Sequence, residues 1–346
     1  MPKPQRLLQA GTQGRPLSSV IQRRQFMKRR TLVAAGLTMP FANAMANAND
    51  SGKQRTFIVG YSAGGNVDNF ARALGDRAGK LIKQPIIIDN KPGANEMIAT
   101  QMVSRSEPDG RTILISTEAP ITQSQFLYKK LSYVPEELTP IILLAQVPLV
   151  LVARSDLPVS NLKEFLAYAK KNPIIAGSAG IGGVTHLPIA MLAKMQGISW
   201  THVPYKGSAA MFPDLISGRI DVCFTGSSAA LSQIKAGKVK GLGVGTKERM
   251  SALPNVETFE ENGLDGIGAK YTIGAYGPKG LPEEIRKQLV AVYTEVLKDP
   301  SFVSAAVTPN SYIVDGAHGS EFQEFLKKDR ASQKNRVEAS GAQLEG

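Results

Sequence analysis

The sequence predicts an α/β protein whose strands form two lobes, each a mostly parallel sheet flanked by helices. Short runs rich in Val and Ile alternate with stretches of helical periodicity from about residue 55 to residue 276. This alternation is typical of strands joined by crossover helices. Ten expected strands exceed the usual sheet of one small domain, which indicates two lobes. After residue 283 only helical patterns follow, and we expect this tail to pack back on an earlier sheet.

The expected strands are short apolar runs with many β-branched residues, bounded by turn formers. In chain order they cover 56–59, 85–89, 112–116, 141–144, 149–153, 174–177, 200–203, 220–224, 240–244 and 271–276. The expected helices carry apolar residues at spacings of three and four. In chain order they cover 68–83, 96–106, 161–171, 185–196, 209–217, 229–236, 283–299 and 320–340.

Two segments mark the expected crossings between lobes. One is the long apolar stretch 140–153, and the other is the Gly- and Pro-rich stretch 271–280. We therefore expect a discontinuous first lobe made of 49–148 plus 275–346. The second lobe would consist of 149–274.

Residues 1–48 resemble an export signal. They contain eight Lys or Arg and no acidic residue, and 31–41 is an uncharged apolar run. That run is too short to span a bilayer, which needs about 20 residues. Arg23-Arg24-Gln25-Phe26-Met27-Lys28 matches the twin-arginine pattern, and small residues at alternate positions in 42–48 fit a cleavage site. We expect a cleaved twin-arginine signal peptide and a periplasmic protein, with Sec export or an uncleaved basic arm as alternatives.

The formal net charge of +12 comes mainly from this basic segment. The rest of the chain has 33 basic and 29 acidic residues, so a nucleic-acid partner is not expected. A single cysteine, Cys223, excludes a disulfide framework and a CxxC site. The histidines His186, His202 and His318 form no H-x-x-x-H pair. No metal or other cofactor is therefore expected.

Gly60-Tyr61-Ser62-Ala63-Gly64 is a G-x-S-x-G sequence between an expected strand and an expected helix. A serine hydrolase places its nucleophile in such a turn, but there the helix begins directly at the serine. Here Gly65 and Asn66 prolong the loop. The favoured interpretation is a loop that leads backbone N–H groups into a helix N-terminus, with Asn66 as N-cap and Asp68 in the first turn. Such a terminus attracts anions. An exported hydrolase using Ser62 is the alternative.

Residues 177–186 (GSAGIGGVTH) again join an apolar strand to a helix. The segment lacks the glycine spacing of a dinucleotide loop and the lysine of a phosphate loop. Its glycines permit close backbone approach to a ligand, and Ser178 and Thr185 supply hydroxyl groups. A glycine-rich connection that binds nothing is the structural alternative.

Several motifs in the same order resemble those of one known family. They are Gly64-Gly65-Asn66-Val67-Asp68, Asp89-Asn90-Lys91-Pro92-Gly93-Ala94, Gly180-Ile181-Gly182 with His186-Leu187, and His202-Val203-Pro204-Tyr205-Lys206-Gly207. Together with further matches they span essentially all of 55–340. The sequence is thereby similar to the Bug (TctC) family, the solute-binding proteins of tripartite tricarboxylate transporters.

This resemblance implies a two-lobed, type II-like periplasmic binding protein that is not an enzyme. It implies a small carboxylate in the cleft between the lobes, a monomer, and delivery of the ligand to transporter membrane subunits or to a sensor. The implied ligand contacts are Ser62, Gly64, Gly65, Asn66, Asp68, Gly182, Gly183, Val184 and Thr185, with Tyr205 nearby.

Some positions depart from the family pattern. Family members commonly have Asp where this chain has Thr225, and Ser or Thr where it has Gly183. Thr225 is kept as a candidate contact. Glu118, after the third strand, is a further candidate that would pair with a ligand amino or hydroxyl group. The alternative for Glu118 is an exposed loop acid.

Overall fold

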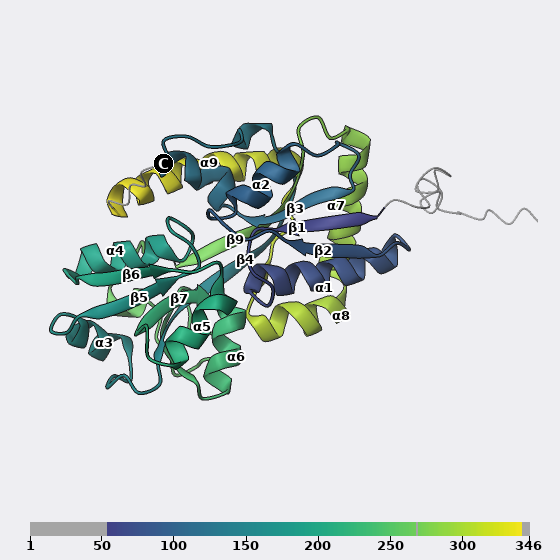
Figure 1. Ribbon diagram of the computed structural model, residues 1–346. Helices are drawn as coiled ribbons and strands as arrows, with labels where there is room; N and C mark the ends of the chain where they lie inside the picture. The colour runs from purple at the N-terminus through teal and green to yellow at the C-terminus, as the bar shows by residue number, and fades with distance from the viewer. Residues whose placement is uncertain (1–53, 268, 341–346) are drawn as a thin grey trace, which may run out of the picture. The chain divides into compact units, whose positions relative to one another are not determined.

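The computed structural model describes residues 54–267 and 269–340 (Figure 1). The expected signal segment 1–48, with its Arg23-Arg24 pair, lies outside the described residues. The strands are β1 (Arg55–Val59), β2 (Ile86–Asn90), β3 (Thr112–Thr117), β4 (Thr139–Arg154), β5 (Ile174–Ser178), β6 (Trp200–Pro204), β7 (Val222–Gly226), β8 (Val239–Val244), β9 (Lys270–Gly277) and β10 (Ile313–Val314). The α-helices are α1 (Asn66–Leu81), α2 (Met97–Ser104), α3 (Leu162–Ala169), α4 (His186–Gln196), α5 (Ser208–Ile216), α6 (Ser227–Lys235), α7 (Glu283–Lys298), α8 (Pro300–Phe302) and α9 (Gly319–Ser340).

The strands pair in the order β2-β1-β3-β9-β4-β7-β5-β6, and β8 and β10 each pair with β4. β1 is parallel to β2 and β3, and β5 is parallel to β6 and β7. β9 is antiparallel to β3 and β4, and β4 is antiparallel to β7, β8 and β10. The α/β class is confirmed, but the expectation of mostly parallel sheets is wrong for the central strands. β4 and β9 are direct antiparallel neighbours, whereas a crossover helix would make them parallel.

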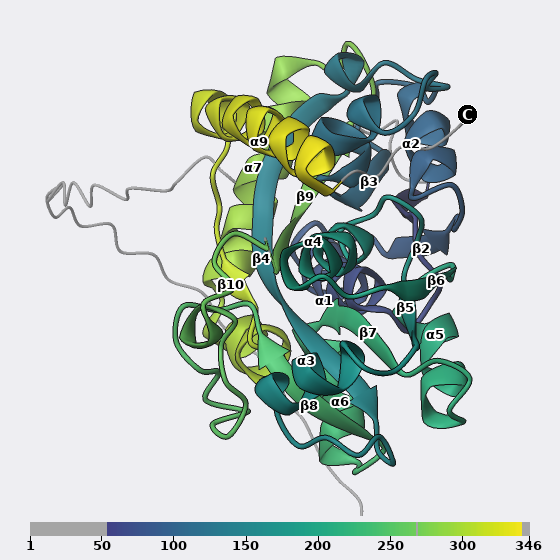
Figure 2. The same ribbon diagram turned by 90° about the vertical axis from the view of Figure 1, so that its left-hand side faces the viewer.

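β4 takes part in two sheets. Residues 139–148 pair with β9, and residues 149–154 pair with β7 and β8. We call β2, β1, β3, β9, β10 and the first part of β4 the first sheet. The second part of β4 with β7, β8, β5 and β6 is the second sheet. Figure 2 shows β4 running from the region of α7 and α9 to that of α3 and α6.

The sequence predicts two strands where the structure has the single strand β4. Twelve of the 16 residues of this strand are buried, because neighbours cover both of its edges and helices cover its faces. Gln146 and Pro148 lie between the two predicted strands, yet both pair with β9, at Thr272 and Lys270.

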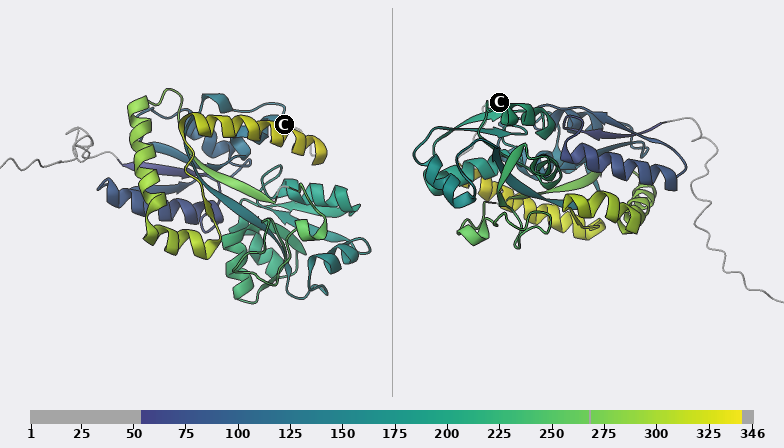
Figure 3. Two further views of the ribbon diagram at one scale, coloured as in Figure 1. Left: turned by 180° about the vertical axis from the view of Figure 1, so that it is seen from behind. Right: turned by 90° about the horizontal axis from the view of Figure 1, so that it is seen from below.

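Helices cover both sheets. α1 buries Val67, Phe70, Leu74 and Ala78, an apolar stripe at helical spacing, and it packs on β1, β2 and α7. The C-terminal helix α9 contacts β4 and the short π-helix η2 (Ala119–Gln123), as expected for a tail that packs back, and it also contacts α4. The left panel of Figure 3 shows α7, α8 and α9, coloured light green to yellow, from behind. Within the described residues, no helix is both long and apolar enough to cross a bilayer.

Candidate functional site

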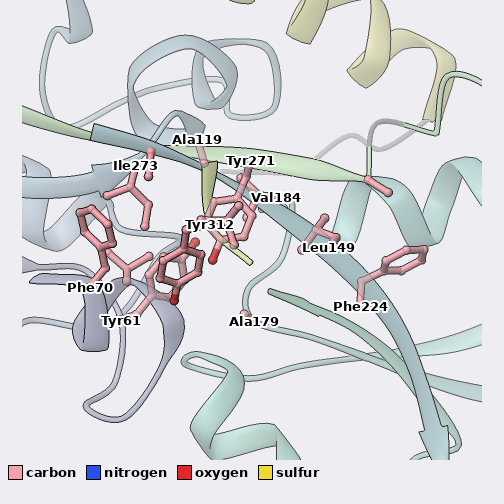
Figure 4. Packing of buried hydrophobic residues seen from close by; sticks show 14 of the residues in the cluster. Tyr61, Phe70, Ala119, Leu149, Ala179, Val184, Phe224, Tyr271, Ile273 and Tyr312 are labelled. Atoms are coloured by element: carbon pink, nitrogen blue, oxygen red, sulfur yellow. The ribbon is translucent and has the colours of Figure 1, made fainter. Parts of the chain in front are cut away.

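The loops that enter four helices meet at one small cavity between the two sheets. The first sheet contributes the β1–α1 loop, the end of β3 and one residue of β9, and the second sheet contributes the loops before α4, α5 and α6. The lining residues are Tyr61, Gly65, Asn66, Val67, Thr117, Ala179, Val184, Thr185, Ser208, Gly226 and Tyr271. Figure 4 shows Tyr61, Tyr271 and Tyr312 gathered at this junction with Ala179 and Val184.

Helix N-termini dominate the chemistry of this cavity. Gly65 precedes α1, Thr185 precedes α4, Ser208 begins α5, and Gly226 precedes α6. The N–H groups of a first helical turn have no acceptor within the helix, and the helix dipole makes that end positive. No Lys or Arg is among the lining residues. The cavity is therefore suited to an anion that is bound by backbone N–H groups.

The cavity is nearly closed in this structure. Its volume is about 20 Å³, which is room for about one water molecule. Hydrogen bonds join the two sides: Ser62 N donates to Lys206 O at 3.1 Å, and Ala229 N donates to Asn66 Oδ1 at 3.1 Å. A ligand of metabolite size fits only when the two sides move apart.

A larger open groove of about 820 Å³ lies along α7. Its lining residues are those of α7 together with Asp299 and His318, which precede α8 and α9, so nothing from the second sheet reaches it. The small cavity is the better candidate because residues from both sheets and four helix N-termini meet there.

The structure brings together part of the expected first-lobe set. Gly65 and Asn66 line the cavity. Ser62 lies beside it, and its hydroxyl donates to the carbonyl of Lys206 rather than to an imidazole. The histidines of the described residues are engaged elsewhere: the rings of His186 and His202 stack at 3.9 Å, and His318 Nδ1 lies 2.9 Å from Gly316 O. The hydrolase alternative therefore gains no support from the geometry at Ser62.

Gly64 and Asp68 shape the first loop instead of lining the cavity. Gly64 has φ +81°, a left-handed conformation that favours glycine, and its N–H donates to Asp68 Oδ2 at 2.8 Å. Asp68 is buried and also accepts from Arg72 Nε and Asn90 Nδ2, each at 2.9 Å. Burial opposes ionisation of this carboxyl, but hydrogen bonds from Arg72, Gly64 and Asn90 outweigh it and lower the pKa of Asp68. The resulting carboxylate holds the loop before α1 in place.

The second-lobe set is divided in the same way. Val184 and Thr185 line the cavity, and Thr185 Oγ1 accepts from Ala179 N at 2.9 Å. Gly182 does not line it: its N–H donates to His186 Nδ1 at 2.9 Å, and its carbonyl accepts from the amide of Gln123. Burial is the main cause that lowers the pKa of His186, to about 4, so the imidazole is neutral and able to accept this bond.

Two further expected contacts lie behind or away from the cavity wall. Thr225 Oγ1 donates to Ser208 Oγ at 3.0 Å, so Thr225 supports a lining residue. The hydroxyl of Tyr205 donates to Asp214 Oδ2 at 2.7 Å, and Tyr205 is not among the lining residues. Gly183 also stands outside the lining set, facing Asn95 of the first sheet's side.

The position of Glu118 differs from both sequence interpretations, the ligand contact and the exposed loop acid. Its side chain is neither an exposed loop acid nor part of the cavity wall, because it is 3% exposed and absent from the lining residues. Its Oε2 accepts from Thr272 N at 2.7 Å and from Thr272 Oγ1 at 2.9 Å. Burial and the charge of Asp329 raise the pKa of Glu118 to about 8. Through these hydrogen bonds the buried Glu118 links the end of β3 to β9.

Sequence reasoning missed the aromatic and hydroxyl side of the cavity, made by Tyr61, Thr117 and Tyr271. Behind it lies Glu96, fully buried, whose carboxylate accepts from Ser116 Oγ at 2.7 Å and from the hydroxyl and N–H of Thr117. Burial raises the pKa of Glu96. The only sequence signal for Thr117 was its place at the end of a strand next to Glu118.

Within the described residues, no group of three His, Cys, Asp or Glu side chains is arranged to hold a metal ion. The observed polar groups instead suit the recognition of an organic anion by hydrogen bonds.

Known proteins share both the sequence pattern and the fold. The sequence model of the tripartite tricarboxylate transporter family receptor (TctC) matches residues 70–339. The periplasmic binding protein BugD has a similar structure, with 31% identity and a TM-score of 0.80 over 85% of this chain and 99% of that chain. A Rhodopseudomonas palustris protein, Rpa4515 with adipate, matches at 28% identity and TM-score 0.80 over 83% of this chain and 97% of that chain.

A second Rhodopseudomonas palustris protein, MatC with bound malate, matches at 27% identity and TM-score 0.77, over 82% of this chain and 98% of that chain. These neighbours confirm the fold of a two-lobed periplasmic binding protein. The matched family covers most of the chain. The protein belongs to the tripartite tricarboxylate transporter receptor (TctC) family of periplasmic solute-binding proteins.

Proposed function

We propose that this protein captures a small dicarboxylate in the periplasm and delivers it to the membrane subunits of a transporter or to a sensor. The observation that carries the proposal is the meeting of four helix N-termini at a cavity without Lys or Arg. Backbone N–H groups and helix dipoles then supply the positive potential for the carboxylates. Adipate and malate, the ligands of two similar structures, are both dicarboxylates.

We further propose that capture proceeds by hinge closure of two lobes, 49–148 plus 275–346 and 149–274. The support for this is that β4 runs through both sheets, while β9 pairs with its first part. α1 begins on one side of the cavity, and α4, α5 and α6 begin on the other. A ligand with a carboxylate at each end would contact both sides only when they are closed, so its binding shifts the population toward the closed state. The protein would do this as a monomer.

Export by the twin-arginine route is the proposed path to the periplasm. Arg23-Arg24 supports it, because this route reads the guanidinium pair rather than charge alone. Replacing both arginines by lysine should leave the precursor in the cytoplasm, as measured by cell fractionation. Unchanged export of the Lys-Lys variant would assign the segment to Sec.

The ligand proposal is tested by isothermal titration calorimetry of the purified protein with succinate, malate, aspartate and adipate. The dimethyl esters of succinate and adipate are the controls, because they keep the carbon chain and remove the charge. We expect at least one of the acids to bind and no ester to bind. An ester that binds as tightly as its acid would contradict the anion site, and silence of all these acids would contradict the dicarboxylate class.

A further inference from the structure

Asn95 is a buried amide that the structure leaves without a partner. It lies before α2, between two other residues in left-handed conformation: φ is +45° at Ala94, +49° at Asn95 and +69° at Glu96. Asn95 is 7% exposed, and neither its Oδ1 nor its Nδ2 makes a hydrogen bond. A buried amide with no partner loses its hydration without compensation.

The amide of Asn95 is aimed at the glycine loop of the second sheet. A Cβ atom added to Gly183 would lie 2.4 Å from Asn95 Oδ1, and one added to Gly180 would lie 3.3 Å from it. Ala179 and Val184, on either side of these glycines in the chain, line the cavity. Asn95 is not among the lining residues of the closed cavity; it packs against these glycines, next to the lining residues Ala179 and Val184.

The next residue, Glu96, holds the backbone at Asn95 in place through its buried side chain. It accepts hydrogen bonds from Ser116 and Thr117, as described above, and Gly60 lies so close that an added Cβ would be 2.6 Å from Glu96 Cβ. Thr117 lines the cavity. Asn95 therefore stands on a rigid support between the polar wall of the first sheet and the loop before α4.

We propose that Asn95 selects ligands that carry a hydrogen-bond donor on the carbon next to a carboxylate, that is, 2-hydroxy or 2-amino dicarboxylates. This inference rests on the proposed function and names the substrate class of that site. A plain carboxylate accepts from Nδ2 and leaves Oδ1 unpaired. A neighbouring hydroxyl or ammonium group donates to Oδ1, so only such a ligand pairs both atoms of the buried amide. Asn95 takes the selecting role that the sequence suggested for Glu118.

The test is calorimetric titration with malate, aspartate and succinate, which share the four-carbon dicarboxylate skeleton. Wild-type protein should bind malate or aspartate at least about ten-fold more tightly than succinate. Asn95→Gly, which suits the left-handed backbone, should weaken all three acids by removing Nδ2. It should also reduce this ratio to about two-fold, because it removes the acceptor Oδ1 that only the substituted acids use. Asn95→Asp is the isosteric second variant: it removes the donor Nδ2 and keeps acceptor oxygens, so it should weaken all three acids and keep the preference for the substituted acids. Asn172→Ala, a distant asparagine bonded to Tyr168 O, is the control and should behave as wild type.

Each outcome separates this inference from the proposed function. Equal binding of succinate and the substituted acids by wild type overturns the role of Asn95 but leaves a dicarboxylate receptor. A preference that survives in Asn95→Gly also overturns it. Binding of none of the three acids, with adipate bound, overturns the substrate class named here and keeps the anion site. If malate, aspartate, succinate and adipate all fail to bind, both proposals are wrong.

Discussion

Gly183 controls how closely the two sides of the cavity approach. An alanine Cβ there would lie 2.4 Å from Asn95 Oδ1 and 3.4 Å from Gly180 O. The backbone of Gly183 is outside the left-handed region, so alanine itself is compatible with the loop. The steric conflict arises only in the closed arrangement, where the second-sheet loop meets Asn95. A side chain at this residue should therefore act on ligand binding more than on folding.

We predict that Gly183→Ala weakens binding of the dicarboxylate found by calorimetry. Overpacking costs about 1–3 kcal/mol. If this cost falls on the closed, ligand-bound state, it lowers the apparent affinity by roughly 5- to 150-fold. Gly263→Ala is the matched control, because Gly263 has φ +67° and open space around its missing Cβ. It should lower the melting temperature and leave affinity unchanged.

The partner of this effect can be identified by a double-mutant cycle. In the Asn95→Gly background the conflict disappears, so Gly183→Ala should then cause little further loss of affinity. Wild-type affinity in Gly183→Ala, or an equal loss in both backgrounds, would contradict the contact between Gly183 and Asn95 as the cause.

At the scale of elements, the buried Glu118 and the half-buried Asp329 form an acidic pair that joins α9 to the π-helix η2 and to β9. Glu118, before η2, is bonded to Thr272 of β9, and Asp329 of α9 accepts from Thr122 Oγ1 at 2.5 Å. Burial raises the pKa of both acids, and the charge of Asp329 further raises that of Glu118. The pair holds a proton at neutral pH that the unfolded chain has released.

This proton predicts how stability depends on pH. The pKa of Glu118 is about 8 in the folded protein and near its ordinary 4.5 when unfolded. The native state therefore binds more protons across that range, and its contribution to stability falls as pH rises from about 4.5 to about 8. Glu118→Gln should flatten this fall and should exceed wild type at pH 8.5 by at least about 1 kcal/mol, close to the free energy of one pKa unit.

Urea unfolding at pH 5, 7 and 8.5 measures this effect. The control is Glu324→Gln on the exposed side of α9, where the carboxylate lies 3.7 Å from Lys328 Nζ. It should follow the wild-type pH profile. A Glu118→Gln variant whose stability falls with pH as steeply as wild type would show that the acidic pair does not hold the proton.

The sequence predicted local features well and contacts between distant loops poorly. Two strand–loop–helix units, whose helices begin at Asn66 and His186, were predicted from hydrophobic periodicity and glycine runs within about 20 residues. Tyr61, Thr117 and Tyr271 meet only because β1, β3 and β9 are neighbours in one sheet, which no local pattern encodes. β10 was missed because it has only two residues.

The predicted site shows the same division. Residues in the loops at the start of a helix, such as Gly65 and Thr185, line the cavity as expected. Asp68 and Gly182 were in the right loops, but their polar groups are used within those loops. Asn95 had no sequence signal, because its importance depends on the absence of a partner in the folded protein.

At the scale of the whole molecule, the described residues form a state in which the two sides are in contact around a cavity of about 20 Å³. Asn66, at the start of α1, bonds to Ala229 of α6, and Ser62 bonds to Lys206. The amide of Gln123 also bonds to Gly182 O, and Ser227 Oγ donates to Asn310 O across the two sides. Ligand capture as proposed requires that helix N-termini on both sides of the cavity bind the carboxylates.

Amide chemical-shift mapping by NMR tests this claim most directly. The bound acid would be the dicarboxylate that binds in calorimetry, added to ¹⁵N-labelled protein. We predict the largest amide shifts in the first turns of α1, α4, α5 and α6, at residues such as Val67 and Thr185, on both sides of the cavity. Shifts confined to one side, or gathered along the α7 groove near Lys287, would contradict the account.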